Sequence, residues 1–211
     1  MTRDAPQRIS LEDGGELLLV EGWLSPPEAA RFFGALMREV PWEQKAISMM
    51  GKKVMQPRLV AWFGDPGAVY TYSGVRNDPL PWTPALLELK ARAEQAAEHA
   101  FNSVLANLYR DGRDSMGFHA DKERELGEDP VIASVSLGAT RRFQLRYTGK
   151  KKGVAGRDID LTDGSLLVMR GTTQHFWRHG IPKETAPVGA RINLTFRWIE
   201  SRGRASPARA T

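Results

Sequence analysis

The segment that most constrains the fold is residues 191–198, which read R-I-N-L-T-F-R-W. A β-strand directs successive side chains to opposite faces, so one face would be apolar and pack on a core: Ile192, Leu194, Phe196 and Trp198. The other face would carry Arg191, Asn193, Thr195 and Arg197. A solvated face with two arginines is common. If the row instead faces inward, two guanidinium forks suit a small dianion with a carboxylate at each end.

Composition limits the class of protein. The 211 residues include 41% hydrophobic residues and no run that could span a bilayer, and residues 2–15 are polar, so we expect one soluble monomeric domain in the cytoplasm, or in the nucleus of a eukaryote. Without cysteine, any metal must be held by carboxylates and the four histidines. A net charge of +5 fits an anionic partner such as nucleic acid, although residues 201–211, expected to be a disordered basic tail, hold three arginines.

Helix signals are confined to the N-terminal half. The segment Ser25-Pro26-Pro27-Glu28 predicts a capped helix that continues to about residue 39, and Thr83-Pro84 begins a second that ends near residue 99. We expect strands at residues 17–23 and 59–63 and then in succession at residues 103–109, 131–137, 142–147, 158–161, 165–169 and 174–178. This order argues for a β-sandwich or jelly roll with helices against one side.

A candidate metal site begins at His119 and Asp121, which lie two residues apart on one side of an extended segment. H-x-D alone is a weak signal and needs a third ligand, for which His175 and His179 are both candidates, four residues apart on an expected strand. Two histidines and one carboxylate leave positions open on an octahedral ion, as in non-haem Fe(II) oxygenases. Such enzymes need a two-electron co-substrate.

The dianion that the arginine row would bind fits 2-oxoglutarate, the co-substrate of many such oxygenases. Arg191 and Arg197 follow the second histidine in the chain and lie on one strand. Asn107 and Tyr109, on one face of their own strand, would offer further hydrogen-bond donors.

Four motifs in order resemble the AlkB family of Fe(II)/2-oxoglutarate dioxygenases over about residues 57–198: N-L-Y-R-D-G from Asn107, H-A-D-K-E from His119, I-A-S-V-S-L-G from Ile132 and R-I-N-L-T-F-R from Arg191. The resemblance implies a mostly β protein with N-terminal helices (α+β) and a double-stranded β-helix core (jelly roll, cupin-like). Residues 1–200 would form a single domain, with helices and a nucleotide-recognition lid at about 15–100 and the jelly-roll core at 101–199.

The resemblance also implies roles for individual residues. The iron ligands would be His119, Asp121 and His179, with His179 chosen over His175 because the family's distal histidine precedes a small residue, an aliphatic one and often proline, as in Gly180-Ile181-Pro182. Arg191 would bind the distal carboxylate of 2-oxoglutarate, and Arg197 would steer the carboxylate that chelates iron. Four further residues would assist the two arginines: Asn107, Tyr109, Asn193 and Thr195.

Within the family, the chain looks most similar to the branch that repairs double-stranded DNA, because of Tyr70-Thr71-Tyr72-Ser73-Gly74 and the spacing of Met50-Gly51-Lys52 before Pro57. Tyr72 and His119 would stack on a flipped base, Glu123 would meet its exocyclic nitrogen, and Tyr70 and Ser73 would line the pocket. Met49, Met50 and Gly51 would be a finger that fills the vacated stack. This chain departs from the family here, because two flexible methionines stand where a branched or aromatic pair is expected.

The implied activity is DNA repair by oxidative dealkylation. Using Fe(II), O2 and 2-oxoglutarate, the enzyme would demethylate 1-methyladenine and 3-methylcytosine and release formaldehyde, succinate and CO2. The alternatives are an RNA demethylase or another 2-oxoglutarate-dependent hydroxylase on the same iron core. A catalytically silent nucleic-acid-binding module is a third reading, against which the complete ligand set argues.

Overall fold

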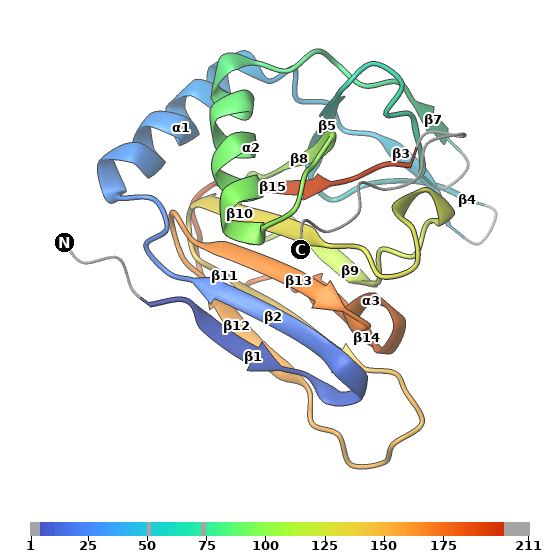
Figure 1. Cartoon of the computed structure of the whole chain (residues 1–211). Coiled ribbons are helices and arrows are strands. Elements are labelled where there is room, and N and C mark those ends of the chain that lie inside the picture. Colours follow the sequence, from blue (N-terminus) through green and yellow to red (C-terminus); the bar gives the residue numbers. More distant parts are fainter. Residues whose placement is uncertain (1–4, 50–51, 73–74, 201–211) are drawn as a thin grey trace.

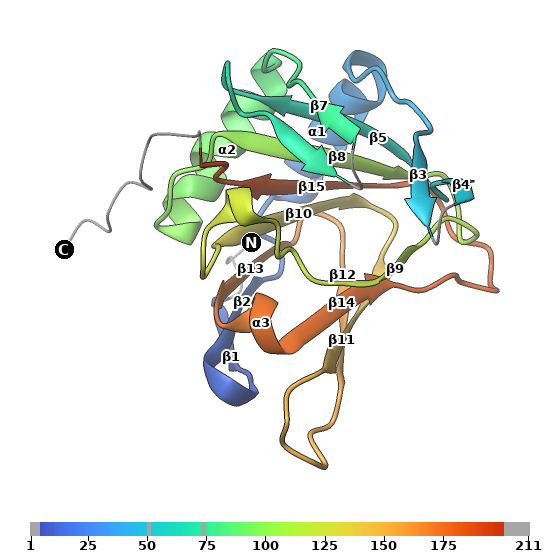
Figure 2. The same cartoon turned by 90° about the vertical axis from the view of Figure 1, so that its right-hand side faces the viewer.

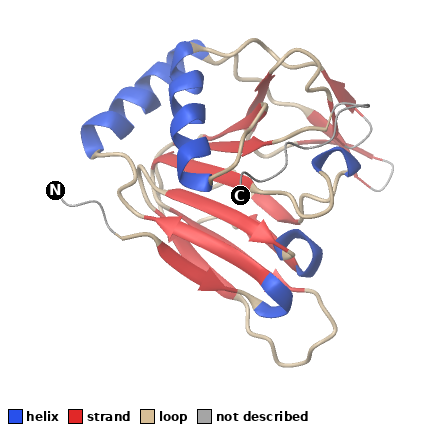
Figure 3. Cartoon of the chain, viewed as in Figure 1, coloured by secondary structure: helices blue, strands red, loops and turns tan. Residues whose placement is uncertain are grey.

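Two antiparallel sheets face each other in the structure, a computed structural model that describes residues 5–49, 52–72 and 75–200 (Figures 1 and 3). The larger sheet has the order β1 (Gln7–Ser10), β2 (Gly15–Val20), β13 (Leu166–Gly171), β10 (Ile132–Gly138), β15 (Arg191–Arg197), β8 (Ser103–Tyr109), β5 (Leu59–Gly64). The smaller sheet has the order β12 (Arg157–Leu161), β11 (Arg141–Tyr147), β14 (Trp177–Ile181), β9 (Met116–His119). The expected jelly-roll fold is thereby confirmed.

Two helices, α1 (Pro26–Glu39) and α2 (Pro84–Ala97), cover the outer face of the larger sheet (Figure 1). Both begin where the sequence indicates. The Glu28 carboxylate accepts a hydrogen bond from Ser25 N at 2.9 Å, and Thr83 Oγ1 accepts one from Leu86 N at 3.3 Å. The apolar side of each helix is buried against the sheet, as expected from its spacing.

The larger sheet is buried on both faces, which explains its continuous apolar runs such as L-L-L-V in β2. Leu18 and Val20 pack with the helices, whereas Leu17 and Leu19 belong to the core between the two sheets. In β15 the apolar face packs under the helices: Ile192, Leu194 and Phe196. The opposite face of β15 therefore looks into the space between the sheets. Since β15 lies between β10 and β8, its polar row is mounted on a central strand.

One expected strand is wrong. Residues 173–176 form a short helix, α3 (Thr173–Phe176), and β14 starts only at Trp177. The turn is held by the carbonyl of Thr172, which accepts hydrogen bonds from His175 N and Phe176 N, and by Thr173 Oγ1, which donates to Arg170 O at 2.5 Å. His175 and His179 are consequently not four apart on one strand. The larger sheet also contains β2 and β5, so the sheets extend beyond the residues 101–199 that were expected to form the jelly-roll core.

Two small hairpins and two 3-10 turns complete the described chain (Figure 2). β3 (Ala46–Met49) pairs with β4 (Lys52–Met55), and β6 (Tyr70–Tyr72) pairs with β7 (Val75–Asn77). The turns are η1 (Glu12–Gly14) and η2 (Arg124–Leu126). Met50, Gly51, Ser73 and the expected tail 201–211 lie outside the described residues. In the described part of the chain, no helix has the length and apolar character needed to cross a membrane.

Candidate metal centre and co-substrate pocket

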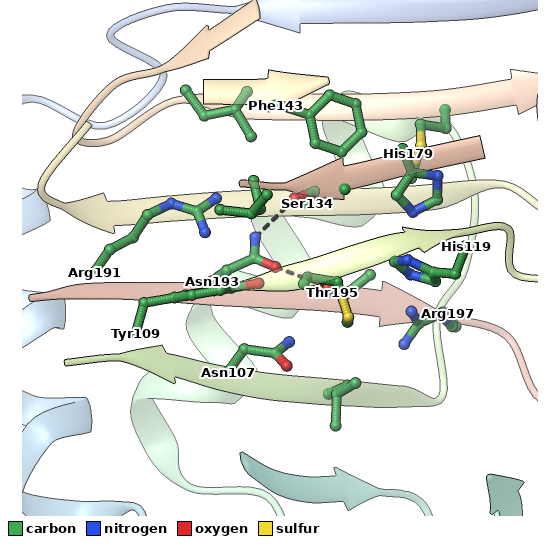
Figure 4. A pocket seen from close by; sticks show the side chains of 16 residues that line it. Asn107, Tyr109, His119, Ser134, Phe143, His179, Arg191, Asn193, Thr195 and Arg197 are labelled. Carbon is green, nitrogen blue, oxygen red and sulfur yellow. Dashed lines mark hydrogen bonds between the residues drawn. The ribbon is translucent and has the colours of Figure 1, made fainter. Parts of the chain in front are cut away.

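His119, Asp121 and His179 are brought together between the two sheets. His119 ends β9 and is paired with His179 of the adjacent β14, so the two imidazoles point to the same side, with ring centroids 4.4 Å apart (Figure 4). Asp121 follows β9 directly, and one ligand atom from each of the three residues lies within 4.8 Å of the other two. Among the described residues this is the one cluster of this kind. Its composition is that of a two-histidine, one-carboxylate iron site.

Asp121 is held as a carboxylate. Its Oδ2 accepts hydrogen bonds from Arg197 Nη2 at 2.9 Å and Nε at 3.2 Å, and its Oδ1 lies 3.8 Å from His119 Nε2. Burial is the largest single influence and would raise the pKa of Asp121, but the charge and hydrogen bonds of Arg197 together with the two histidines outweigh it and lower this pKa to about 2. Asp121 is therefore ionised at neutral pH, as a metal ligand must be.

The two histidines each offer a ring nitrogen to a metal. His119 Nδ1 lies 3.0 Å from the Gly117 carbonyl, and donation to that oxygen leaves Nε2 with a free lone pair. Burial lowers the pKa of His179 to about 3, with His119 and Arg197 acting in the same direction and the charge of Asp121 opposing them. The Nδ1 of His179 is buried without a hydrogen-bond partner, and Phe143 stacks on the ring with centroids 5.3 Å apart. Two imidazoles and one carboxylate fit a divalent iron ion.

His175 lies outside this cluster. Its Nε2 is 2.7 Å from the carbonyl oxygen of Glu128 and 3.0 Å from Asp129 Oδ1. The cluster does not include His175, so the geometry favours His179 as the third ligand. Choosing between the two from sequence required the tripeptide that follows His179, because the strand pattern expected around His175 was wrong.

The polar row of β15 lines the cavity next to the metal cluster: Arg191, Asn193, Thr195 and Arg197. Arg197 lies at the end near the two histidines and Arg191 at the opposite end (Figure 4). Asn107 and Tyr109 of the adjacent β8 also line the cavity, as expected. The two arginines are thus placed at the two ends of the polar row that lines this pocket.

Arg191 is a buried cation with no acidic partner among the described residues. Only 1% of the residue is exposed, Nη2 donates to Ser136 Oγ at 2.9 Å, and Nε and Nη1 have no hydrogen-bond partner among the described residues. Burial lowers the pKa of Arg191 to about 10; the hydroxyl of Tyr109 opposes this shift, and the charge of the nearby Arg141 adds to it. Its guanidinium also lies 5.2 Å from the ring centroid of Tyr109. Because an unpaired buried charge is costly, this end of the pocket suits a carboxylate.

Several contacts at the site were missed from the sequence. Asn193 Nδ2 donates to Ser134 Oγ at 2.8 Å, and Ser136 holds Arg191 as described. The alternation I-A-S-V-S-L-G in β10 could have indicated both serines, because they share one face of an otherwise apolar strand. The buried Arg58 donates from Nε to Asn107 Oδ1 at 2.8 Å, a contact between distant segments that no local pattern marks.

The residues expected to meet DNA are described less completely. Glu123 lies two residues after Asp121 in the chain, and its Oε2 is buried with no hydrogen-bond partner among the residues that the structure describes. Tyr70 and Tyr72 lie in β6, and Met49 ends β3. The expected contacts of Ser73, Met50 and Gly51 fall outside the described residues.

Comparison with known proteins agrees with this geometry. Residues 16–197 match the model of the 2OG-Fe(II) oxygenase superfamily. Alpha-ketoglutarate-dependent dioxygenase alkB homolog 3 from Homo sapiens is 40% identical over 97% of this chain and 74% of its own length. The chain belongs to the AlkB family of 2OG-Fe(II) oxygenases. It is therefore an Fe(II)- and 2-oxoglutarate-dependent dioxygenase that uses O2.

A second group of AlkB-family relatives matches nearly as well. The DNA oxidative demethylase ALKBH2 from Homo sapiens is 38% identical over 82% of this chain and 69% of its own length. The solved structure entitled "The structure of OsALKBH1" superposes with a TM-score of 0.60 at 18% identity, covering 91% of this chain and 100% of that one, and supports the fold alone. Because two kinds of AlkB homologue match, placement in a duplex-repairing branch stays a prediction.

Proposed function

We propose that this AlkB-family dioxygenase removes N-methyl groups from 1-methyladenine and 3-methylcytosine in DNA. The observation that carries the proposal is the metal cluster at one end of a pocket whose other end holds the unpaired cation Arg191. By their names, one relative is an alpha-ketoglutarate-dependent dioxygenase and the other is a DNA oxidative demethylase. The net charge of +5 also suits a polyanionic substrate.

In this proposal His119, Asp121 and His179 hold Fe(II), and Arg197 keeps Asp121 ionised and orients it. With O2 and 2-oxoglutarate, the bound iron supplies the oxidation of the N-methyl group, which leaves as formaldehyde while succinate and CO2 are formed. Arg191 and Tyr109 bind the distal carboxylate of 2-oxoglutarate. Arg197 also lies where it would steer the carboxylate that chelates the metal.

The remaining cavity residues hold the co-substrate end in place. Asn193 is fixed by Ser134 and accepts from Thr195 Oγ1 at 3.1 Å, and Asn107 is fixed by Arg58. These neutral side chains hold the polar row of β15 in place without adding charge. The two arginines are then the only charged groups of that row, one for each carboxylate of the co-substrate. A rigid first layer of this kind keeps reacting groups at a fixed distance.

The methylated base would be recognised by side chains that lie around the metal site. Tyr72 and His119 would stack on it, Tyr70 and Ser73 would line its pocket, and Glu123, whose Oε2 has no partner, would accept a hydrogen bond from its exocyclic amino group. Removal of the methyl group restores the Watson–Crick edge of the base.

We further propose double-stranded DNA as the preferred form. Met49, Met50 and Gly51 would act as a finger at the β3–β4 hairpin, whose second strand exposes 39% of Val54 and 51% of Met55 beside the exposed Lys53. Apolar side chains on a basic hairpin suit insertion into a base stack next to phosphates.

Formaldehyde release tests the proposal. The same methylated sequence would be supplied as a DNA duplex, as single-stranded DNA and as RNA, with an unmethylated duplex as the control. The proposal predicts release from methylated DNA that depends on 2-oxoglutarate, and faster release from the duplex. Faster release from RNA would favour the RNA demethylase, and no release from any methylated strand would favour another hydroxylase substrate.

A further inference from the structure

Two consecutive residues of the short helix α3 contact the loop that follows β9 and contains Asp121, called the metal-binding loop below. It connects β13 to β14 and lies beside the chain that follows β9 (Figure 2). Its start is fixed to the larger sheet, because Thr173 Oγ1 accepts a hydrogen bond from Glu16 N at 3.1 Å and Thr172 N lies 3.4 Å from Gly14 O. A single turn of helix is marginal in isolation, so these bonds to β2 and its approach determine its position.

Gln174 binds the main chain of the iron ligand. The Gln174 side chain is 1% exposed, and its Oε1 accepts a hydrogen bond from the backbone N–H of Asp121 at 2.9 Å. Its amide nitrogen reaches only the sulfur of Met169, at 3.5 Å. The buried Gln174 amide therefore fixes the main chain of Asp121, and Arg197 fixes the carboxylate at the other end of the same side chain.

His175 binds the same loop further along the chain. Its ring contacts the Glu128 carbonyl and the Asp129 carboxylate, and its own carbonyl accepts a hydrogen bond from Lys122 Nζ at 2.9 Å. Glu123 lies between these two attachment points. The loop is thus held before and after Glu123, whose Oε2 is buried without a hydrogen-bond partner in the described part of the chain.

We propose that α3 is a positioning element that sets the spacing between the iron and the substrate base. Gln174 positions Asp121 for metal binding, and His175 positions the segment that carries Glu123. The first part concerns the metal alone, and the second rests on the proposed function. The helix adds no ligand and touches no reacting atom, so both are positioning residues.

The two parts predict different defects. Replacing Gln174 by Met keeps the volume but removes the acceptor, leaving a buried N–H unsatisfied beside the metal ligand. Loss of such an outer-shell partner typically weakens metal binding by roughly 10- to 100-fold.

His175→Ala should leave the affinity for metal unchanged and raise the Michaelis constant for methylated DNA several-fold. His175→Gln, which can still donate to the Glu128 carbonyl, should restore much of it.

Mn(II) titrated alone into each variant, in the absence of DNA and 2-oxoglutarate, tests the first part independently of any reaction. Gln144→Met is the matched control, since Gln144 bonds only Asp158 on the outer face of the smaller sheet. Gln174→Asn, which stays polar but is too short to reach Asp121 N, serves if Gln174→Met does not fold. Weakened Mn(II) binding in the Gln174 variants, with the control unchanged, is the expected result.

Three outcomes would overturn the proposal. Wild-type Mn(II) affinity in Gln174→Asn or Gln174→Met would show that Asp121 needs no such support. Equal losses of affinity in the Gln174 variants, His175→Ala and the control would mean a general loss of stability. A fall in Mn(II) affinity for His175→Ala as large as that for the Gln174 variants would make His175 a ligand and not a loop anchor.

Discussion

Replacing Arg191 by methionine separates a binding role from a structural one, because the two roles predict opposite changes in stability. Arg191 is buried, and two of its three nitrogens have no hydrogen-bond partner in the part of the chain that the structure describes. Methionine fills similar volume without a charge, and removing an unpaired buried charge in favour of an apolar side chain is often neutral or stabilising. The melting temperature of the Arg191→Met protein without co-substrate should therefore stay the same or rise.

Binding of 2-oxoglutarate should be lost at the same time. A hydrogen bond to a charged group is worth about 1.5–3 kcal/mol, and 1.4 kcal/mol is a factor of ten, so the affinity should fall roughly 10- to 150-fold. The rise in melting temperature that 2-oxoglutarate causes in the wild type should shrink accordingly. Arg191→Lys should not restore it, since lysine keeps the charge but lacks the planar fork.

Thermal unfolding with and without 2-oxoglutarate, followed by the Michaelis constant for 2-oxoglutarate, measures both effects. Arg142→Met is a matched control, because Arg142 is exposed on the outer face of the smaller sheet, 3.9 Å from Asp160. An unchanged Michaelis constant together with a lower melting temperature in Arg191→Met would refute the reasoning and make Arg191 a structural residue.

Three further predictions follow from the structure. His179→Ala should abolish turnover and Mn(II) binding, and retention of either would remove His179 from the ligand set. Met49→Ala with Met50→Ala should slow repair of a methylated duplex several-fold and spare single-stranded substrate, because only a duplex has a stack to fill; equal losses with a lower melting temperature would place both side chains in the core. Hydrogen bonds from Ser25 lower the pKa of Glu28 from 4.5 to about 2, so Glu28 stabilises the fold above pH 4.5 and this stabilisation is lost as the pH falls toward 2. Glu28→Gln should flatten that part of an acid unfolding curve, and an unchanged curve would contradict the assignment.

The sequence was most informative where one local rule decides the structure. The alternation in residues 191–197 gave both faces of β15, and Ser25 and Thr83 marked the starts of α1 and α2. The sequence was least informative where contacts with distant segments of the chain determine the local structure. Residues 173–176 carry no helical periodicity, and α3 forms because Thr173 and Gln174 bond to segments far away in the chain.

The basic loop after β11 shows the same limit for charge. Lys150, Lys151 and Lys152 look like a free cationic turn, which would suit a DNA backbone. Lys151 Nζ instead lies 2.5 Å from Glu12 Oε1 and 2.9 Å from Asp13 Oδ1, at the N-terminal side of the larger sheet. A run of like charges in a sequence does not reveal which of its members are neutralised by tertiary contacts.

The most direct test of the account is the stoichiometry of a single reaction on DNA containing 1-methyladenine, with formaldehyde and succinate measured together. The account predicts equal amounts of the two products from the methylated strand, and neither product from His179→Ala. Succinate formed at the same rate with and without the methylated strand, and without formaldehyde, would contradict it, because 2-oxoglutarate turnover would then not be coupled to removal of the methyl group.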